Sequence, residues 1–294
     1  MRRPSPRNLI ASLMIFWLAA LGGLAWGGDY ASLPTRPWNP SSLARLKVHT
    51  PKTLSFAVFG DSRNSQVVFP RLLQEVEEDP QIAFAIHLGD MVQDGYRQEY
   101  SLFFGQIRQN LRKPLLTVVG NHELHKKNRI VYEEIFGPAY YSFQVGENYF
   151  IAVDDAQKDS LHDRQLRWLE QELKKAQAFK RRLVFMHTPL FDPRGGKRHQ
   201  AMMAANGQRL AELCQKYRVT HVFAGHIHGY FAGAWDGVPF TVTGGAVAEI
   251  KKPDPQHYFF HYVKVSLQGD EVRVEVKRLP VTEPEGGPHP AFGN

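Results

Sequence analysis

Cysteine is nearly absent from this chain of 294 residues, since Cys214 is the only one. A single cysteine cannot form a disulfide framework, and it excludes metal sites built from several thiolates. Stability must therefore come from a hydrophobic core. About 265 residues follow the N-terminal segment, which is enough for one large domain to bury the apolar area it needs.

Charge is missing from one long stretch near the N-terminus. Leu9–Trp26 carries no charged residue, and Arg2, Arg3 and Arg7 precede it. This pattern is typical of an export signal or of an uncleaved anchor. The apolar run is long for a signal and short for a membrane span, so both interpretations stay open. We expect residues 1–27 to be a signal peptide or an N-terminal membrane anchor. We then expect the protein to be exported (periplasmic or extracellular) or membrane-anchored and facing outside the cytoplasm, and any membrane association to run through the N-terminus.

A strong excess of positive charge is also lacking. The formal net charge is +7, and three of these charges belong to residues 1–27, which leaves +4 for the rest. A nucleic-acid-binding domain concentrates basic residues on one face, and no such stripe is visible here. The sequence therefore gives no strong nucleic-acid signal.

The remainder of the chain divides by composition into three parts. Residues 28–50 are rich in proline, serine and threonine and are predicted to be a linker. Residues 51–280 have the alternating pattern of a folded domain. The segment 281–294 is rich in proline and glycine and is predicted to be a flexible tail.

Short β-branched runs alternate with segments of helical period throughout the predicted domain, which indicates an α/β layered fold. Two sheets flanked by helices account for the number of runs, and a hairpin at 140–153 makes some strands antiparallel. The expected strands are 54–59, 82–88, 114–119, 140–145, 149–153, 182–186, 220–224, 237–243, 258–266 and 271–278, and the expected helices are 69–78, 96–110, 163–179 and 207–217.

Five short motifs each follow an apolar run. They offer Asp, Asn or His at the points where predicted strands end, and the carboxyl ends of strands are where α/β sheets bind ligands. Oxygen and imidazole ligands in this mixture suit Zn, Mn or Fe. The motifs are G-D-S-R at 60–63, G-D-M-V at 89–92, G-N-H-E at 120–123, M-H-T-P at 186–189 and G-H-I-H at 225–228, and they supply Asp61, Asp90, Asn121, His187, His226 and His228.

In content and order, these motifs resemble those of the calcineurin-like metallophosphoesterases, over about residues 53–278. The resemblance implies a four-layer α/β/β/α sandwich. It also implies a hydrolase that cleaves a phosphate mono- or diester through attack of a metal-bound hydroxide on phosphorus, with two divalent or trivalent metal ions (Mn, Fe or Zn). The substrate expected from it is a phosphorylated small molecule.

The resemblance also implies a role for each motif residue. Asp90 would bridge the two metals, and His122 would be the general acid that protonates the leaving group. The first metal would be held by Asp61, Asp90 and His228, and the second by Asp90, Asn121, His187 and His226.

Arg63 departs from the family pattern, because a histidine ligand is expected at that position. Guanidinium has no acceptor and keeps its proton, so it cannot bind a cation. Three hypotheses follow. Asp94 or Tyr96 completes the first metal's ligands, the first metal is bound weakly through water, or Arg63 replaces part of its charge and contacts the substrate phosphate as a catalytic and substrate-binding residue. A bland alternative makes Arg63 the salt-bridge partner of a nearby carboxylate.

The loop after His187 is basic and should overhang the site. Arg194, Lys197 and Arg198 are therefore predicted to bind an anionic substrate together with Arg63 and Asn121, although an ordinary solvated loop is an equal alternative. Histidines outside the motifs have simpler roles. His87 and His221 are expected in the core, and His125 and His162 in solvent.

A non-enzymatic function is the main alternative. The arginine in the first motif could mark a phosphate- or nucleotide-binding relative that has an impaired first metal site and no catalysis. Turnover of a phosphate ester would distinguish the two.

Overall fold

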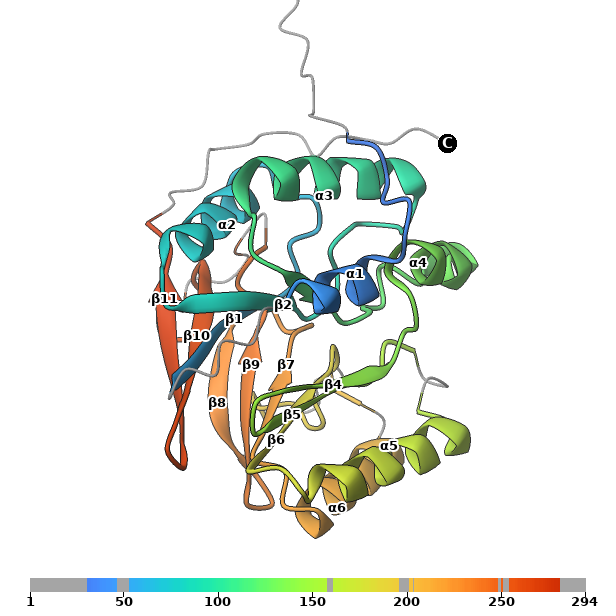
Figure 1. Cartoon of the computed structure of the whole chain (residues 1–294), viewed down its shortest axis with the longest axis vertical. Helices are drawn as coiled ribbons and strands as arrows, with labels where there is room; N and C mark the ends of the chain where they lie inside the picture. Colours follow the sequence, from blue (N-terminus) through green and yellow to red (C-terminus); the bar gives the residue numbers. More distant parts are fainter. Residues whose placement is uncertain are drawn as a thin grey trace, which may run out of the picture.

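The computed structural model describes residues 31–46, 53–157, 161–195, 201–202, 204–247, 250 and 254–280. Two sheets pack face to face, and helices cover their outer sides, so the chain has the predicted four layers (Figure 1). The predicted signal or anchor at 1–27 and the predicted tail at 281–294 lie outside the described residues. In the part of the chain that the structure describes, no helix has the length and apolarity needed to cross a membrane.

The first sheet has five strands in the order β11-β10-β1-β2-β3. Strands β1, β2 and β3, which run from the middle of the sheet to one edge, are parallel to one another. Strand β10 runs antiparallel to both β1 and β11. Phe59 lies opposite His87, and His87 lies opposite Thr117, so the carboxyl ends of the parallel strands are aligned. The strands are β1 (Thr53–Phe59), β2 (Ile82–His87), β3 (Leu115–Thr117), β10 (His261–Gln268) and β11 (Glu271–Arg278).

The second sheet has six strands in the order β4-β5-β6-β7-β9-β8. The expected hairpin is confirmed by the antiparallel pairing of β4 with β5, and β5, β6, β7 and β9 are parallel. The edge strand β8 was not predicted, because its exposed Ala232, Gly233 and Ala234 lack the apolar pattern of a strand. The strands are β4 (Tyr141–Val145), β5 (Asn148–Ala152), β6 (Arg181–Phe185), β7 (His221–Ala224), β8 (Tyr230–Trp235) and β9 (Val238–Thr243).

The helices form the two outer layers. α2 and α3 lie on the first sheet and α5 and α6 on the second (Figure 1). In α5, Leu166, Leu169 and Leu173 form the predicted buried stripe, and the imidazole of His162 accepts the Gln165 N–H at 3.1 Å, which caps the helix. The helices are α1 (Trp38–Ala44), α2 (Val68–Glu78), α3 (Arg97–Asn110), α4 (Arg129–Phe136), α5 (Asp163–Ala176) and α6 (Ala204–Lys216).

Part of the segment predicted as a linker packs against the domain as helix α1. The indole N–H of Trp38 donates to the Leu115 carbonyl at 2.8 Å, and the side-chain oxygen of Asn39 accepts the Thr117 N–H at 3.0 Å. Both contacts are made to β3, which is an edge strand of the first sheet. The segment therefore covers backbone groups that would otherwise be unpaired at that edge.

Aromatic rings fill the space between the two sheets. Phe56 and Phe84 from the first sheet stack at 5.1 Å, and Phe185 and Phe223 from the second stack at 5.2 Å. The rings of Phe56 and Phe185 meet edge-on at 6.1 Å across the interface. Such pairs add about 0.5–1.5 kcal/mol each to the burial energy. This packing fixes the relative position of the two sheets, and hence of the loops at their carboxyl ends.

Candidate metal centre

All five motifs lie directly beyond the carboxyl ends of parallel strands, as predicted. The loops after β1, β2 and β3 of the first sheet meet the loops after β6 and β7 of the second. Asp61, Asp90 and His226 have φ angles of 69°, 56° and 66°, which is the left-handed region that non-glycine residues seldom adopt. The Asp61 N–H donates to the Gly89 carbonyl at 2.9 Å and thereby joins the first two loops.

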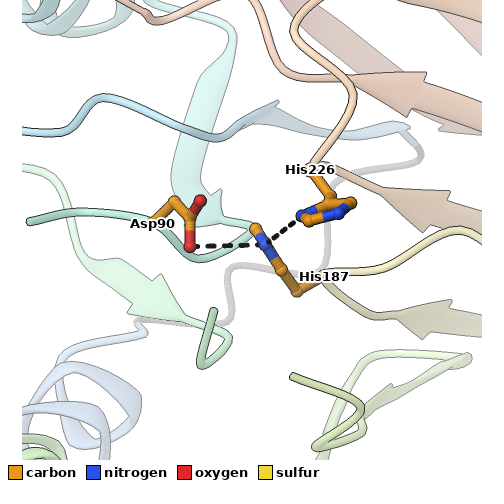
Figure 2. A group of neighbouring side chains, drawn as sticks. All are labelled: Asp90, His187 and His226. Carbon is orange, nitrogen blue, oxygen red and sulfur yellow. Dashed lines mark hydrogen bonds and ion pairs between the residues drawn. The ribbon is translucent and has the colours of Figure 1, made fainter. Parts of the chain in front are cut away.

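Four predicted ligands of the second metal converge on one point. Nε2 of His187 lies 2.9 Å from Asn121 Oδ1, 3.1 Å from His226 Nδ1 and 3.3 Å from Asp90 Oδ1. Figure 2 shows Asp90, His187 and His226 pointing toward one another. Ligand atoms that share a metal about 2.1 Å from each lie about 3 Å apart, so these spacings fit a single ion.

Contacts on the far side of the His187 ring select its tautomer. A carbonyl can only accept, so Nδ1 carries a proton that it donates to the Leu88 carbonyl at 2.8 Å. The Nε2 lone pair therefore faces the other ligands, an arrangement that is common for metal-binding histidines. The backbone at this position is held by Asp155, whose two oxygens accept the N–H groups of His187 and Thr188 at 2.8 Å each.

The predicted ligands of the first metal form a second group beside it, and the two share Asp90. Atoms of Asp61, Asp90 and His228 that could bind a cation all lie within 4.8 Å of one another. Both oxygens of Asp61 accept the His226 N–H, at 3.0 and 3.1 Å. Nε2 of His228 lies 3.6 Å from Asp61 Oδ1, and it is buried without a hydrogen-bond partner among the described residues.

Burial sets the protonation of these groups. It lowers the pKa of His226 to about 3, and burial together with Arg63 lowers that of His228 to about 3, so both imidazoles are neutral at pH 7 and able to bind a metal. Burial and the charge of Asp90 raise the pKa of Asp61. Burial alone would raise the pKa of Asp90 as well. The nearby His187, His122 and Arg63 lower it by more, so the pKa of Asp90 lies below its usual value. Buried lone pairs and carboxylates in this arrangement fit a cation.

Arg63 is paired with the shared carboxylate. Its Nη2 donates to Asp90 Oδ2 at 3.0 Å. The side chains weighed as replacement ligands are engaged elsewhere, since the hydroxyl of Tyr96 accepts from Lys126 at 2.6 Å and Asp94 lies 3.3 Å from His125. Among the described His, Cys, Asp and Glu residues, Asp94 belongs to neither ligand group.

His122 stands at the edge of both groups. Its Nδ1 donates to the Gln93 carbonyl at 2.5 Å, so Nε2 is the atom that faces the site, 3.7 Å from Asp90 Oδ2. Burial lowers the pKa of His122, and the charge of Asp90 opposes this effect. The backbone N–H of His122 donates to Asp90 Oδ1 at 3.0 Å, which places the ring beside the shared carboxylate.

Two buried acids were not predicted to support the site. Glu123 accepts backbone N–H groups from Asp90, Met91, Val92 and Gly120 at 2.7–3.2 Å, and Asp155 holds the His187 backbone. Burial and the charge of Asp90 raise the pKa of Glu123 to about 8. Glu123 belongs to the G-N-H-E motif, so a signal for it was present, but an acid that accepts from backbone groups is indistinguishable in sequence from a solvated one.

Outside the ligand groups, the predictions have mixed outcomes. His87 and His221 are in the core as predicted, with Nε2 atoms 3.0 Å from Ser62 Oγ and 2.9 Å from Thr241 Oγ1. Arg194 is paired with Asp192 at 2.6 Å and lines a hollow of about 940 Å³ whose described lining includes none of the six predicted ligands. Lys197 and Arg198 lie outside the described residues, so their substrate-binding role stays a prediction.

Similarity to known proteins agrees with this geometry. The family model described as calcineurin-like phosphoesterase matches residues 54–230, which is more than half of the chain. A probable cyclic nucleotide phosphodiesterase of Rhodopseudomonas palustris is 28% identical over 214 residues, which cover 66% of this chain and 77% of the relative. Probable purple acid phosphatase 20 of Arabidopsis thaliana is 27% identical over 65% of this chain, and the match spans only 50% of that protein.

Solved structures share the fold. Purple acid phosphatase PPD1 from yellow lupin superposes with a TM-score of 0.63 at 18% identity, over 77% of this chain and 51% of that one. GAP50 of Plasmodium, the anchor in the inner membrane complex, gives a TM-score of 0.62 at 13% identity, over 77% and 84% of the two chains. At these identities the likeness is one of fold.

Proposed function

This chain belongs to the calcineurin-like phosphoesterases, and from that membership and its two adjoining ligand groups we propose that it hydrolyses a phosphate ester in a metal-dependent reaction. The observation that carries the proposal is the convergence of Asp90, Asn121 and His226 on Nε2 of His187. Metal bound there would polarise the phosphoryl group and activate water for attack on phosphorus. Mn, Fe and Zn all accept these ligands.

His122 is the proposed general acid. Its Nδ1 proton is committed to the Gln93 carbonyl, so the ring is held with Nε2 toward the site. When protonated, Nε2 can deliver its proton to the departing alkoxide oxygen, and the leaving group departs as an alcohol. The neighbouring Asp90 carboxylate, 3.7 Å away, favours the protonated ring and counters the lowering of the His122 pKa by burial.

Arg63 and Asn121 are the proposed contacts to the phosphoryl oxygens. Arg63 gives a hydrogen bond from Nη2 to Asp90, and a quarter of its side chain is exposed, so further donors of the guanidinium are left for a ligand oxygen. The Asn121 side chain places its oxygen at His187, which leaves its NH₂ as a donor. Arg194, Lys197 and Arg198 remain proposed substrate contacts.

A phosphorylated small molecule is the proposed substrate, and a cyclic nucleotide is the first to test because of the phosphodiesterase relative. The purified chain should be assayed with aryl phosphate mono- and diesters and with 3′,5′-cyclic AMP, after chelation and after addition of Mn²⁺, Zn²⁺ or Fe²⁺. Turnover that depends on added metal supports the proposal. Absence of turnover with every substrate and metal contradicts it.

A non-catalytic phosphate- or nucleotide-binding protein is the second candidate, favoured by the Arg63–Asp90 ion pair at the shared carboxylate. It predicts saturable binding of inorganic phosphate or a nucleotide without hydrolysis. Calorimetry on the samples of the turnover assay would separate the two functions.

Export is proposed from the N-terminal sequence alone, in which Arg2, Arg3 and Arg7 precede the uncharged Leu9–Trp26. Mass spectrometry of the protein from fractionated cells would test it. A mature N-terminus near residue 28 indicates a cleaved signal, an intact chain in the membrane fraction indicates an anchor, and an intact chain in the cytosol contradicts export.

A further inference from the structure

We propose that Arg63 is a built-in cation of the first ligand group, so that the chain holds one metal ion tightly, at Asp90, Asn121, His187 and His226, and not two. The starting observation is the 3.0 Å ion pair between Arg63 Nη2 and Asp90 Oδ2. This inference rests on the metal binding proposed above, but it concerns metal content and its test does not depend on turnover.

The guanidinium is held at Asp90 by its backbone as well as by its side chain. The Arg63 N–H donates to the Asp90 carbonyl at 3.0 Å, and the following N–H, of Asn64, donates to the Met91 carbonyl at 3.1 Å. Arg63 has a φ of 41°, a left-handed conformation that turns the loop back over the second motif. Three-quarters of its side chain is buried, so the charge is fixed beside the carboxylate and is not free to move into solvent.

The two oxygens of Asp90 therefore face different partners. Oδ1 faces Nε2 of His187 at 3.3 Å, on the side of the complete ligand group, by which we mean Asp90, Asn121, His187 and His226. Oδ2 is bonded to Arg63. A carboxylate bridges two metals by giving one oxygen to each, and here the second oxygen already neutralises a cation.

The number of possible metal ligands also favours one group over the other. The complete group has an Asp, an Asn and two His side chains, and the tautomer of His187 is fixed by Leu88. Among the described acidic, histidine and cysteine side chains, the other group consists of Asp61, Asp90 and His228, and both Asp61 oxygens also accept the His226 N–H. The side-chain contacts of Tyr96 and Asp94 are made to Lys126 and His125, which do not belong to this group.

Charge repulsion reinforces the missing ligand. A guanidinium stays charged in proteins, so this positive charge cannot be removed to admit a metal. A divalent ion bound by Asp61, Asp90 and His228 would share the Asp90 carboxylate with the guanidinium in a buried place, where screening by water is weak. In the group of Asp61, Asp90 and His228, the positive charge of Arg63 thus takes the place of a metal ion.

Metal counting tests the inference. The full chain is stripped with chelator, reloaded with excess Zn²⁺ or Mn²⁺, desalted, and measured by plasma mass spectrometry against protein concentration. We expect about one ion per chain for the wild type and for Arg63→Lys, which keeps the charge, and about two for Arg63→His, which removes the charge and adds a ligand. In a Mn²⁺ titration, the second equivalent should bind at least about tenfold more tightly to Arg63→His than to the wild type.

Two further variants keep the result interpretable. His187→Ala should lose the tight ion, which identifies the group that holds it, and circular dichroism checks that each variant is folded. Two tightly held ions in the wild type would overturn the inference while leaving the proposed hydrolysis intact. It would equally be overturned if folded Arg63→His still held a single ion, or if Arg63→Lys gained a second.

Discussion

Glu123 holds the loop that presents Asp90. One of its oxygens accepts the Asp90 N–H at 2.7 Å and the Gly120 N–H at 2.8 Å, and the other accepts the Met91 and Val92 N–H groups. The two residues are 33 positions apart, and both are fully buried. A side chain outside both ligand groups therefore positions the carboxylate that the two groups share.

Replacing Glu123 with alanine should destabilise the fold and weaken the site together. Each buried N–H left without an acceptor costs about 1–3 kcal/mol, so several kcal/mol of unfolding free energy should be lost. Urea unfolding measures this, and Glu78→Ala, at an exposed position in α2, is the control and should change stability by less than about 0.5 kcal/mol. A loss for Glu123→Ala no larger than that of the control would contradict the assigned role.

His122→Gln should lower the turnover number and leave metal content unchanged. The imidazole donates to Gln93 and faces the site without belonging to either ligand group, so only proton transfer is removed. General acid catalysis contributes about 10²–10⁴-fold, and this is the expected decrease in kcat. The matched control is His125→Gln, since His125 lies 4.5 Å from His122 ring to ring but is two-fifths exposed. Near-wild-type turnover of His122→Gln would exclude it as the acid.

Stability should fall on acidification because His221 is buried as a neutral ring. Burial lowers its pKa from 6.5 to about 4. Between these values the unfolded chain binds a proton that the folded chain does not, so stability present above pH 6.5 is lost as the pH falls toward 4. We expect the decrease in unfolding free energy between pH 6.5 and 4.5 to be smaller by about 2 kcal/mol in His221→Gln.

Denaturant unfolding of both proteins at the two pH values gives this difference. An unchanged pH dependence in His221→Gln would mean that the folded protein binds a proton at His221 as readily as the unfolded chain does.

Gly244→Ala should disturb the first ligand group. A Cβ at this position would lie 2.7 Å from Asp61 Oδ2 and 2.5 Å from the Ile227 carbonyl oxygen, which is closer than Cβ atoms approach. We expect activity to fall at least about tenfold and stability to fall by about 1–3 kcal/mol, as for other overpacked sites. Gly146→Asn, in the hairpin turn between β4 and β5, has nothing within 4 Å, and asparagine tolerates the left-handed φ of 58° better than other side chains, so it should cost less than Gly244→Ala. Equal effects of the two substitutions would argue against a close passage at Gly244.

The layers and the convergence of the motif side chains could be predicted from the sequence because both depend on local pattern. Apolar runs that end in Asp, Asn or His identify the strands β1, β2 and β6 and the residues that follow them. The stripe of Leu166, Leu169 and Leu173 identified α5, although the helix ends at Ala176 and not at 179. The last turn was overestimated because Phe179 is apolar and continues the helical pattern.

What escaped prediction depends on contacts between distant parts of the chain. Strand β8 lacks alternation, and its pairing with β9 alone defines it. Helix α1 lies in a proline-rich segment and is fixed by bonds from Trp38 and Asn39 to a strand 77–78 positions away. A salt bridge from Arg63 to a nearby carboxylate was among the alternatives, but the identity of its partner, Asp90, and the bond between Tyr96 and Lys126 follow from the packing of loops that no spacing rule describes.

The ligands come from loops of both sheets, and this has a consequence for the order of folding events. The His226 backbone bonds to Asp61 across 165 positions of sequence, so the complete constellation requires both halves of the sandwich to be formed and docked. Closing so long a loop is entropically slow, which makes the native ligand set one of the last features to appear during refolding. Uptake of the proposed metal ion would then stabilise the completed sandwich relative to every earlier species, because a ligand stabilises the state that binds it. Metal incorporation should therefore lag behind the recovery of secondary structure. The ion would stabilise the completed fold and would not nucleate folding.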